Sequence, residues 1–238
     1  MEEKQIRINK YISQCGYCSR READRLIDEG KVFVNGIPIQ MGTKVSSTDE
    51  IMIDGVLLNH QEPEILIALH KPKGIVCTTS KKDSDNVIDY LDFPHRIYPV
   101  GRLDKDSTGL LLLTNNGQLM DDILRGSNFH EKEYIVQVNK PLTDSILRAM
   151  EQGVPILDTM TRPCQIRKTG KDRFHIILTQ GLNRQIRRMC EYFGYRVITL
   201  KRIRIMNIHL DDLPMGQWRY LTPKEIETLK KLAEHKGD

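Results

Sequence analysis

The segment GRLDKDSTGL, residues 101–110, places a carboxylate among basic side chains directly before a run of four leucines. Residues 110–113 are typical of a strand buried on both faces, because no polar residue interrupts them. A charge next to such a core is costly unless it is paired or used. An aspartate is ionised at neutral pH and can act as a nucleophile or a base. We therefore predict that the buried strand is a rigid support for a chemically active charge.

Two further segments combine charge with apolar neighbours. KEYIV, residues 132–136, places an aromatic ring in a strand-like context. GLNRQIRRM, residues 181–189, fits an amphipathic helix with Ile186 and Met189 inward. Its three arginines cannot all point inward, so one or two are expected at the surface. For such a helix, simple solvation is the ordinary alternative to a functional role.

The elements around these segments predict an α+β protein. Residues 6–14 and 19–30 have helical spacing, and Ser19 with Glu22 forms a capping box. Asn35-Gly36 is the turn of a hairpin that begins at residue 32. A polar stretch with Pro63 follows at residues 61–64. We therefore predict a small helix-helix-hairpin domain at residues 1–62 and a second domain at residues 63–238.

The second domain mixes strands and helices without a regular βαβ rhythm, which favours a mixed, mostly antiparallel sheet. Strands are predicted at 65–69, 75–79, 110–113, 133–138, 164–168 and 174–178. Helices are predicted at 143–151, 184–193 and 223–235, and residues 87–91 form a short helix or strand.

Composition limits the class of protein. The chain has 238 residues, enough for a sizeable core without a disulfide framework, and a formal net charge of +4. Residues 181–204 contain seven Arg or Lys residues and a single acidic residue, Glu191. This local excess of positive charge suggests a polyanionic partner. No apolar run approaches a membrane span, and the first residues are too polar for a signal peptide. Together with an odd count of five cysteines, this predicts a cytoplasmic protein that does not bind membranes.

A metal site is not predicted. Cys15 and Cys18 match a C-x-x-C pattern, but no second close pair of Cys or His completes a zinc site. A thioredoxin-like motif would follow a strand, whereas here a helical pattern precedes it. We expect two packed or partly buried thiols.

The string SRREADRLIDEGKVFVNG, residues 19–36, resembles the small RNA-binding domain named after ribosomal small-subunit protein four, over about residues 4–60. The resemblance implies that the arginine-bearing helix and its neighbourhood contact an RNA backbone. The residues implied are Arg20, Arg21, Arg25 and Lys31.

GRLDKDSTGL, KEYIV and GLNRQIRRM, in this order, resemble the three motifs of pseudouridine synthases, and the tail GQWRYLT resembles the RsuA/RluF-type branch. The resemblance implies isomerisation of uridine to pseudouridine in structured RNA, without cofactor or metal. It implies that Asp104 is the essential aspartate, which attacks or deprotonates the target ribose or base. It also implies that Tyr134 stacks on the base and that Arg187 lies beside the aspartate. Leu200 would line the base pocket. Further RNA contacts are implied for Arg102, Leu103, Lys105, Arg184, Gln185, Ile186 and Arg188.

The branch suggests large-subunit ribosomal RNA as substrate, with a transfer RNA as a second one, and a monomeric enzyme that flips its target base. Two other classes of function were weighed. A non-catalytic ribosome-assembly factor would need the basic residues but not Asp104 or Tyr134. A glycosidase using Asp104 and Asp106 is disfavoured, because carboxylates two apart on a strand share a face rather than flank a substrate, and the RNA-binding domain would be unexplained.

Overall fold

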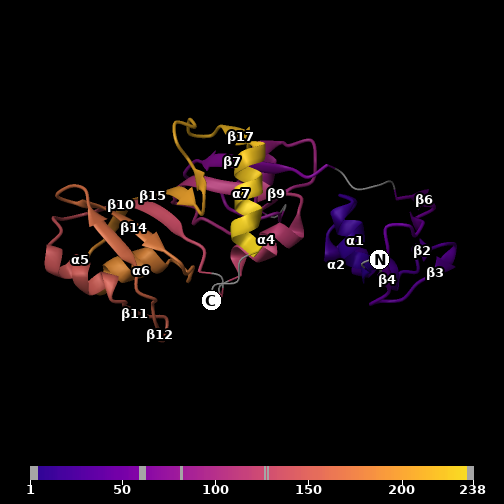
Figure 1. Cartoon of the computed structure of the whole chain (residues 1–238), viewed down its shortest axis with the longest axis horizontal. Coiled ribbons are helices and arrows are strands. Elements are labelled where there is room, and N and C mark those ends of the chain that lie inside the picture. The colour runs from indigo at the N-terminus through magenta and orange to yellow at the C-terminus, as the bar shows by residue number, and fades with distance from the viewer. Residues whose placement is uncertain (1–4, 59–62, 81–82, 126, 128, 235–238) are drawn as a thin grey trace. The chain divides into compact units, whose positions relative to one another are not determined.

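The computed structural model describes residues 5–58, 63–80, 83–125, 127 and 129–234. The chain forms two compact units, Met1–Glu64 and Ile65–Asp238 (Figure 1).

The first unit packs two helices against short strands. α1 (Ile8–Gln14) and α2 (Arg20–Asp28) bury Ile12, Ala23 and Ile27 in a common core. The hydroxyl of Ser19 accepts a hydrogen bond from the Glu22 N–H at 3.1 Å, which caps α2 as the sequence predicts. An antiparallel sheet runs in the order β3 (Ile37–Pro38), β2 (Val32–Val34), β5 (Ile51–Ile53), β6 (Val56–Leu57). A separate pair joins β1 (Ile6–Arg7) to β4 (Lys44–Val45).

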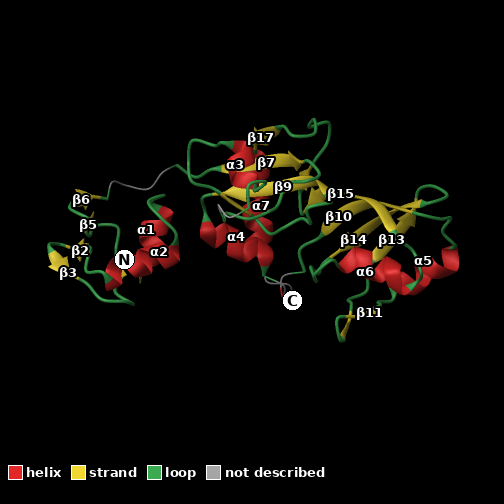
Figure 2. Ribbon diagram, turned by 180° about the vertical axis from the view of Figure 1, so that it is seen from behind, coloured by secondary structure: helices red, strands yellow, loops and turns green. Residues whose placement is uncertain are grey.

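The second unit is built on a nine-stranded sheet (Figure 2). Its main path runs β13 (Gln165–Lys168), β14 (Arg173–Leu178), β10 (Lys132–Val138), β15 (Val197–Ile205), β9 (Thr108–Thr114), β7 (Leu66–Lys71), β17 (Trp218–Tyr220). β8 (Tyr98–Pro99) pairs with β9, and β16 (Ile208–His209) pairs with β15. Within the described sheet every pairing is antiparallel except that of β9 with β15. The mixed, mostly antiparallel sheet predicted from the sequence is confirmed.

Five helices of the described chain accompany this sheet: α3 (Val87–Leu91), α4 (Gly117–Leu124), α5 (Asp144–Glu151), α6 (Gln185–Tyr192) and α7 (Pro223–Glu234). A small hairpin joins β11 (Pro155–Ile156) to β12 (Thr159–Met160). None of the described helices combines the length and apolar character that crossing a membrane requires.

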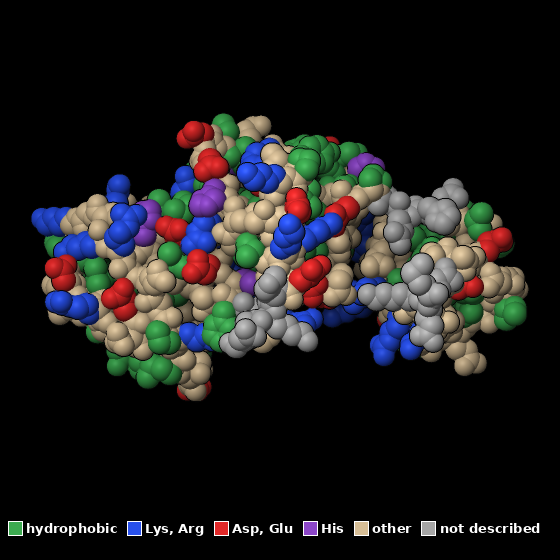
Figure 3. All heavy atoms as spheres, viewed as in Figure 1, with side chains coloured by type: hydrophobic (Ala, Val, Ile, Leu, Met, Phe, Trp, Pro, Cys, Tyr) green, Lys and Arg blue, Asp and Glu red, His purple; other side chains and the backbone are tan. Residues whose placement is uncertain are grey.

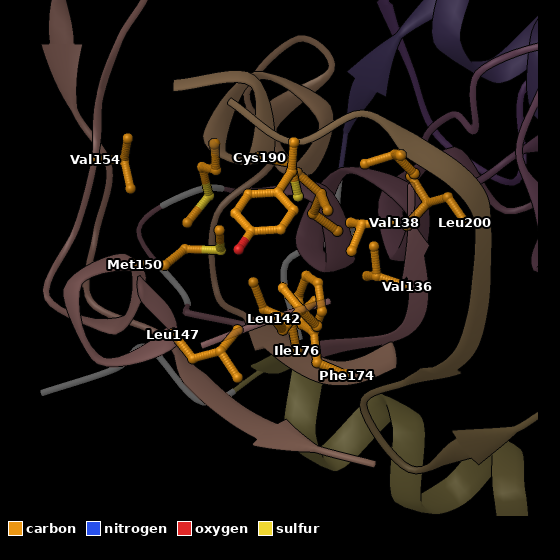
Figure 4. Packing of buried hydrophobic residues seen from close by; sticks show 14 of the residues in the cluster. Val136, Val138, Leu142, Leu147, Met150, Val154, Phe174, Ile176, Cys190 and Leu200 are labelled. Carbon is orange, nitrogen blue, oxygen red and sulfur yellow. The ribbon is translucent and has the colours of Figure 1, made fainter. Parts of the chain in front are cut away.

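Three groups of buried side chains hold the sheet and helices together. α5 and α6 cover β10 and β14 around Val136, Phe174, Ile176 and Met189 (Figure 4). The leucine run divides its side chains between the other two groups. Leu110 and Leu112 pack with α4 and α7, whereas Leu111 and Leu113 pack with β7 and α3. All four are at most 1% exposed, so the strand is buried on both faces as its sequence predicts.

The strand predicted at residues 75–79 is wrong. Val76 forms one isolated bridge with Asn86, and the segment otherwise follows a loop. Its backbone groups have local partners: Val76 N–H donates to Asp85 O at 2.8 Å, and Ile75 O accepts from the Lys71 ammonium at 2.8 Å. These bonds replace a ladder with a neighbouring strand.

The parallel contact between β9 and β15 depends on a glycine. Gly109 lies opposite Arg202, at φ +107°. A Cβ at this position would lie 2.1 Å from the carbonyl oxygen of Arg202 and 2.6 Å from its nitrogen. Both are backbone atoms and cannot rotate away, so the two strands can approach this closely only at a glycine.

We therefore expect Gly109→Ala to separate β9 from β15 and to lower the free energy of unfolding by about 3 kcal/mol or more, through overpacking and backbone strain. Thermal and chemical unfolding would measure the loss. Gly170→Ala is the control, because a Cβ there would meet only ordinary contacts, the nearest at 3.5 Å. Equal stability of the two variants would contradict this account of the contact.

Candidate active site

A cleft of about 1250 Å³ opens in the second unit between the loop before β9, strands β10 and β15, and the start of α6. Nine of the residues predicted from the sequence line it: Arg102, Leu103, Asp104, Lys105, Tyr134, Arg184, Gln185, Ile186 and Leu200. On the face drawn in Figure 3, Lys and Arg side chains of this unit are interspersed with Asp and Glu rather than gathered in one patch.

The loop that carries Asp104 is fixed by its backbone. Leu103 N–H donates to the Cys77 sulfur at 3.3 Å, and Ser107 N–H donates to the carbonyl of Asp104 at 3.0 Å. Gly74 N–H donates to the carbonyl of Lys105 at 2.8 Å. The Asp104 side chain retains 29% exposure. The carboxylate is therefore held in place while still accessible from the cleft.

Two arginines of the α6 region approach this carboxylate. Arg187 Nε lies 3.5 Å from Asp104 Oδ2, and Arg184 Nη1 lies 3.8 Å from the same oxygen. Arg187 is 8% exposed and its Nη2 donates to Ser107 Oγ at 3.4 Å. The fold thus places two residues 83 positions apart, Asp104 and Arg187, in one ion pair at the end of the leucine strand. A carboxylate with cations on one side and an open cleft on the other is suited to nucleophilic or basic chemistry.

The turn into α6 explains why its arginines have different roles. Arg184 adopts a left-handed conformation at φ +50° as the N-cap residue. Arg188 donates to the backbone oxygen of Asn183 at 3.1 Å and to its side-chain oxygen at 3.3 Å, which stabilises the turn. Gln185 accepts from Leu182 N–H at 3.0 Å and is buried. Of the three arginines, Arg184 lines the cleft, whereas Arg187 and Arg188 are not among its lining residues.

Tyr134 lies in the middle of β10, opposite Arg202 of β15 and Ile176 of β14. Its ring is partly buried and packs against two of the hydrophobic groups. Leu200, which is 7% exposed, is two residues from Arg202 on β15 and lines the same cleft. An aromatic ring and an apolar side chain on adjacent strands form a surface on which a flat base could stack.

The sequence reasoning missed two cations in this cleft. Arg202 is 3% exposed; its Nε donates to the Leu110 carbonyl at 2.8 Å, and its guanidinium carbon lies 6.0 Å from the centre of the Tyr134 ring. Its Nη2 is buried without a hydrogen-bond partner. Burial, together with the charge of Arg202, lowers the pKa of Lys132 to about 8. The K-x-Y spacing, which puts both side chains on one strand face, was the available signal.

Lys71 was also missed. Its side chain is fully buried, and its ammonium donates to the carbonyls of Pro72 and Ile75 at 2.8 Å each. Burial lowers the pKa of Lys71, and the nearby Cys77, Asp104 and Asp106 partly offset that effect. Lys71 therefore stabilises the loop at residues 72–75, and Gly74 of this loop bonds to the Asp104 loop.

The predicted RNA-binding cations of the first unit differ in their partners. Arg25 forms ion pairs with Glu22 and Glu29, and Lys31 pairs with Glu29 at 2.8 Å. Arg20 and Arg21 are exposed, and within the described chain no ion pair involves them. Arg20 and Arg21 are therefore the cations of this group that are available to a phosphate without first leaving a carboxylate.

Over the described residues, no group of three or more His, Cys, Asp or Glu side chains is arranged to hold a metal ion. Cys15 is buried and Cys18 half-buried, both as free thiols.

Comparison with known proteins agrees with this architecture. Residues 65–192 match the family model for RNA pseudouridylate synthase, and residues 6–51 match that for the S4 domain. A crystal structure of a pseudouridylate synthase superimposes with a TM-score of 0.69 at 30% identity, covering 94% of this chain and 99% of that one.

Curated relatives match along nearly the whole chain. The dual-specificity RNA pseudouridine synthase RluF of Salmonella typhi is 52% identical over 98% of this chain and 82% of its own length. The ribosomal large subunit pseudouridine synthase B of Bacillus subtilis (strain 168) is 35% identical over 96% and 97%. With the family model covering more than half of the chain, this chain belongs to the RNA pseudouridine synthase family and carries an S4 domain ahead of the catalytic domain.

Proposed function

We propose that this protein isomerises a specific uridine in folded large-subunit ribosomal RNA, with a transfer RNA as a second substrate, and that Asp104 is its essential catalytic group. The observation that carries the proposal is the accessible Asp104 carboxylate, paired with Arg187 at 3.5 Å in a cleft that also contains Tyr134. The choice of RNA rests on the relatives, whose names specify dual specificity or the ribosomal large subunit.

The reaction needs one ionised carboxylate and no redox group. The bond between N1 and ribose C1′ breaks, the base turns in place, and C5 bonds to C1′. Asp104 either attacks C1′ and is displaced when C5 bonds there, or removes a proton from the ribose and returns it once C5 has bonded. Arg187 and Arg184 place positive charge within 4 Å of that carboxylate.

The target uridine leaves its stack to reach Asp104, which lines the cleft. Base extrusion costs a few kcal/mol. Stacking on Tyr134, at about 1 to 3 kcal/mol per base, offsets part of this cost. The same contact retains the detached base until C5 has bonded.

The direct test of this function is pseudouridine mapping in ribosomal and transfer RNA from cells with the gene deleted and then complemented with the parent protein or with Asp104→Asn. The parent should restore a defined site and Asp104→Asn should not, since loss of a covalent or basic catalyst costs several orders of magnitude. RNA affinity of the purified variant should stay close to that of the parent. Restoration of the modification by Asp104→Asn would exclude Asp104 as the essential group.

Tyr134 should act through its ring. Tyr134→Phe keeps the ring, so affinity for RNA should change by less than about threefold, whereas Tyr134→Ala should weaken it by about 10- to 100-fold. Binding titrations and single-turnover rates at saturating RNA would separate the two effects. If Tyr134→Phe binds normally but turns over slowly, the hydroxyl takes part in proton transfer and the stacking role is incomplete.

The first unit should supply affinity through Arg20 and Arg21. Each neutralised phosphate contributes about 0.7 to 0.9 to the slope of log affinity against log salt, so replacing both with alanine should flatten the slope by about one to two units. Replacing Arg25 and Lys31 is the matched control and should flatten it less, because Glu22 and Glu29 already balance these charges. Turnover at saturating RNA should be unchanged in both, since uniform binding does not alter it. A larger effect from the control pair would contradict this assignment.

A further inference from the structure

Two cations in the cleft, the buried Arg202 and the half-buried Lys132, lack an anionic partner. Arg202 and Lys132 project from adjacent strands next to Tyr134, and across the described part of the chain no carboxylate forms an ion pair with either. Lys132 Nζ donates only to the backbone carbonyl of His130, at 3.2 Å, and Arg202 Nη2 has no hydrogen-bond partner. Buried charges are usually paired. A cleft with two cations that have no carboxylate partner can stabilise negative charge that arrives with the substrate or develops during the reaction.

Arg202 and Lys132 are distinct from the two arginines that pair with Asp104. Arg187 and Arg184 already face the Asp104 carboxylate, which is directed at the ribose in the proposed reaction. Arg202 lies instead beside Tyr134, with its guanidinium carbon 6.0 Å from the ring centre. A base lying on the Tyr134 ring would present a carbonyl oxygen to this guanidinium. Arg202 therefore lines the cleft beside the ring on which the base would lie.

We propose that Arg202, with the Lys132 ammonium beside it, is a catalytic residue that stabilises the negative charge uracil acquires when its bond to ribose breaks. This inference rests on the proposed function. When N1–C1′ breaks, the bonding electron pair stays with the base, which becomes a uracil anion with charge on O2 and O4. C5 of the anion then bonds to C1′, C5 loses its proton and N1 gains one, so that neutral pseudouridine results. Preorganised donors stabilise such a charge strongly in a poorly solvated site.

The geometry of the turning base fits a fixed cation. Exchange of N1 for C5 corresponds to rotation about the axis through N3 and C6, which also exchanges O2 and O4. A guanidinium that bonds to one carbonyl oxygen before the rotation therefore meets the other one afterwards. Arg202 can be immobile, as its Nε bond to Leu110 O and its opposition to Gly109 require, and still serve both steps.

The environment of Lys132 supports this view. Burial, and to a lesser degree the charge of Arg202, lowers the pKa of Lys132 to about 8, so the two cations are near enough to repel each other. An anionic base between them would relieve this repulsion. A neutral uridine would relieve it less, so the pair favours the state after bond cleavage over the bound substrate.

The test compares leaving groups. Single-turnover rates at saturating RNA would be measured as loss of the target nucleoside, for the parent, Arg202→Met, Arg202→Lys and Lys132→Met. Two RNAs would be used, identical except for uridine or 5-fluorouridine at the mapped target. Fluorine stabilises the base anion without help from the protein.

Arg202→Met should slow uridine cleavage by about 100-fold or more, and the defect on 5-fluorouridine should be about tenfold smaller. Lys132→Met should show the same pattern with a smaller defect, and Arg202→Lys should restore part of the rate. Arg204→Met is the matched control: Arg204 is on the same strand but is paired with Glu131 and Glu133, so any defect should be equal on both RNAs.

Equal defects on the two RNAs for both Arg202→Lys and Lys132→Met would overturn the inference, even if Arg202→Met fails to fold, because the first variant keeps a cation at position 202 and the second keeps Arg202 itself. Lower RNA affinity with unchanged saturated rates would overturn it as well, since the cations would then serve binding only. A parent protein that forms no pseudouridine would overturn the proposed function itself, which is a different result.

Discussion

The active cleft depends on the close parallel contact of β9 with β15 at Gly109. β9 follows the Asp104 loop, and β15 contributes Arg202 and Leu200 and pairs with β10, which contributes Tyr134. Because Gly109 lacks a Cβ, the two backbones approach directly. One strand pairing thus sets the spacing of the carboxylate, the aromatic ring and the buried guanidinium. Segments far apart in the sequence become a single site because of this contact.

The site uses cations in three different ways. Lys71 is fully buried and bonded to two backbone carbonyls, so its charge supports a loop. Arg187 is paired with Asp104 and bonded to Ser107, so its charge is balanced by the Asp104 carboxylate. Arg202 has a backbone bond at Nε but a free Nη2. Burial of a charge is tolerated only with such compensation, and the degree of compensation separates structural cations from those left for the reaction.

Much of the fold could be predicted from the sequence, because its signals are local. The leucine run, the capped helix at Ser19 and the Asn35-Gly36 turn each depend on neighbouring residues only. The strand predicted at residues 75–79 was wrong because its backbone partners, Lys71 and Asp85, come from outside the segment. The strand propensity of a segment does not reveal hydrogen bonds that it makes with residues outside it.

The candidate site could be predicted only in part, since its members meet through strand register. Resemblance supplied Asp104, Tyr134 and Arg187, and the fold places the first and third in contact. Arg202 lies outside the three motifs, and Lys132 lies within KEYIV without an assigned role; their proximity follows from the pairing of β10 with β15, including an irregularity between Glu133 and Tyr134. Composition alone could not distinguish them from solvated surface cations.

The two units differ in where their cations without an acidic partner lie. In the first unit Arg25 and Lys31 are balanced by acids. Arg20 and Arg21, which form no ion pair among the described residues, are exposed, where each contributes little unless a phosphate is nearby. In the catalytic unit the unpaired Nη2 of Arg202 is buried, where a charge acts strongly but only on a group that enters the cleft. The proposed roles match this division: exposed cations hold RNA of many sequences, and the buried one acts on a single base.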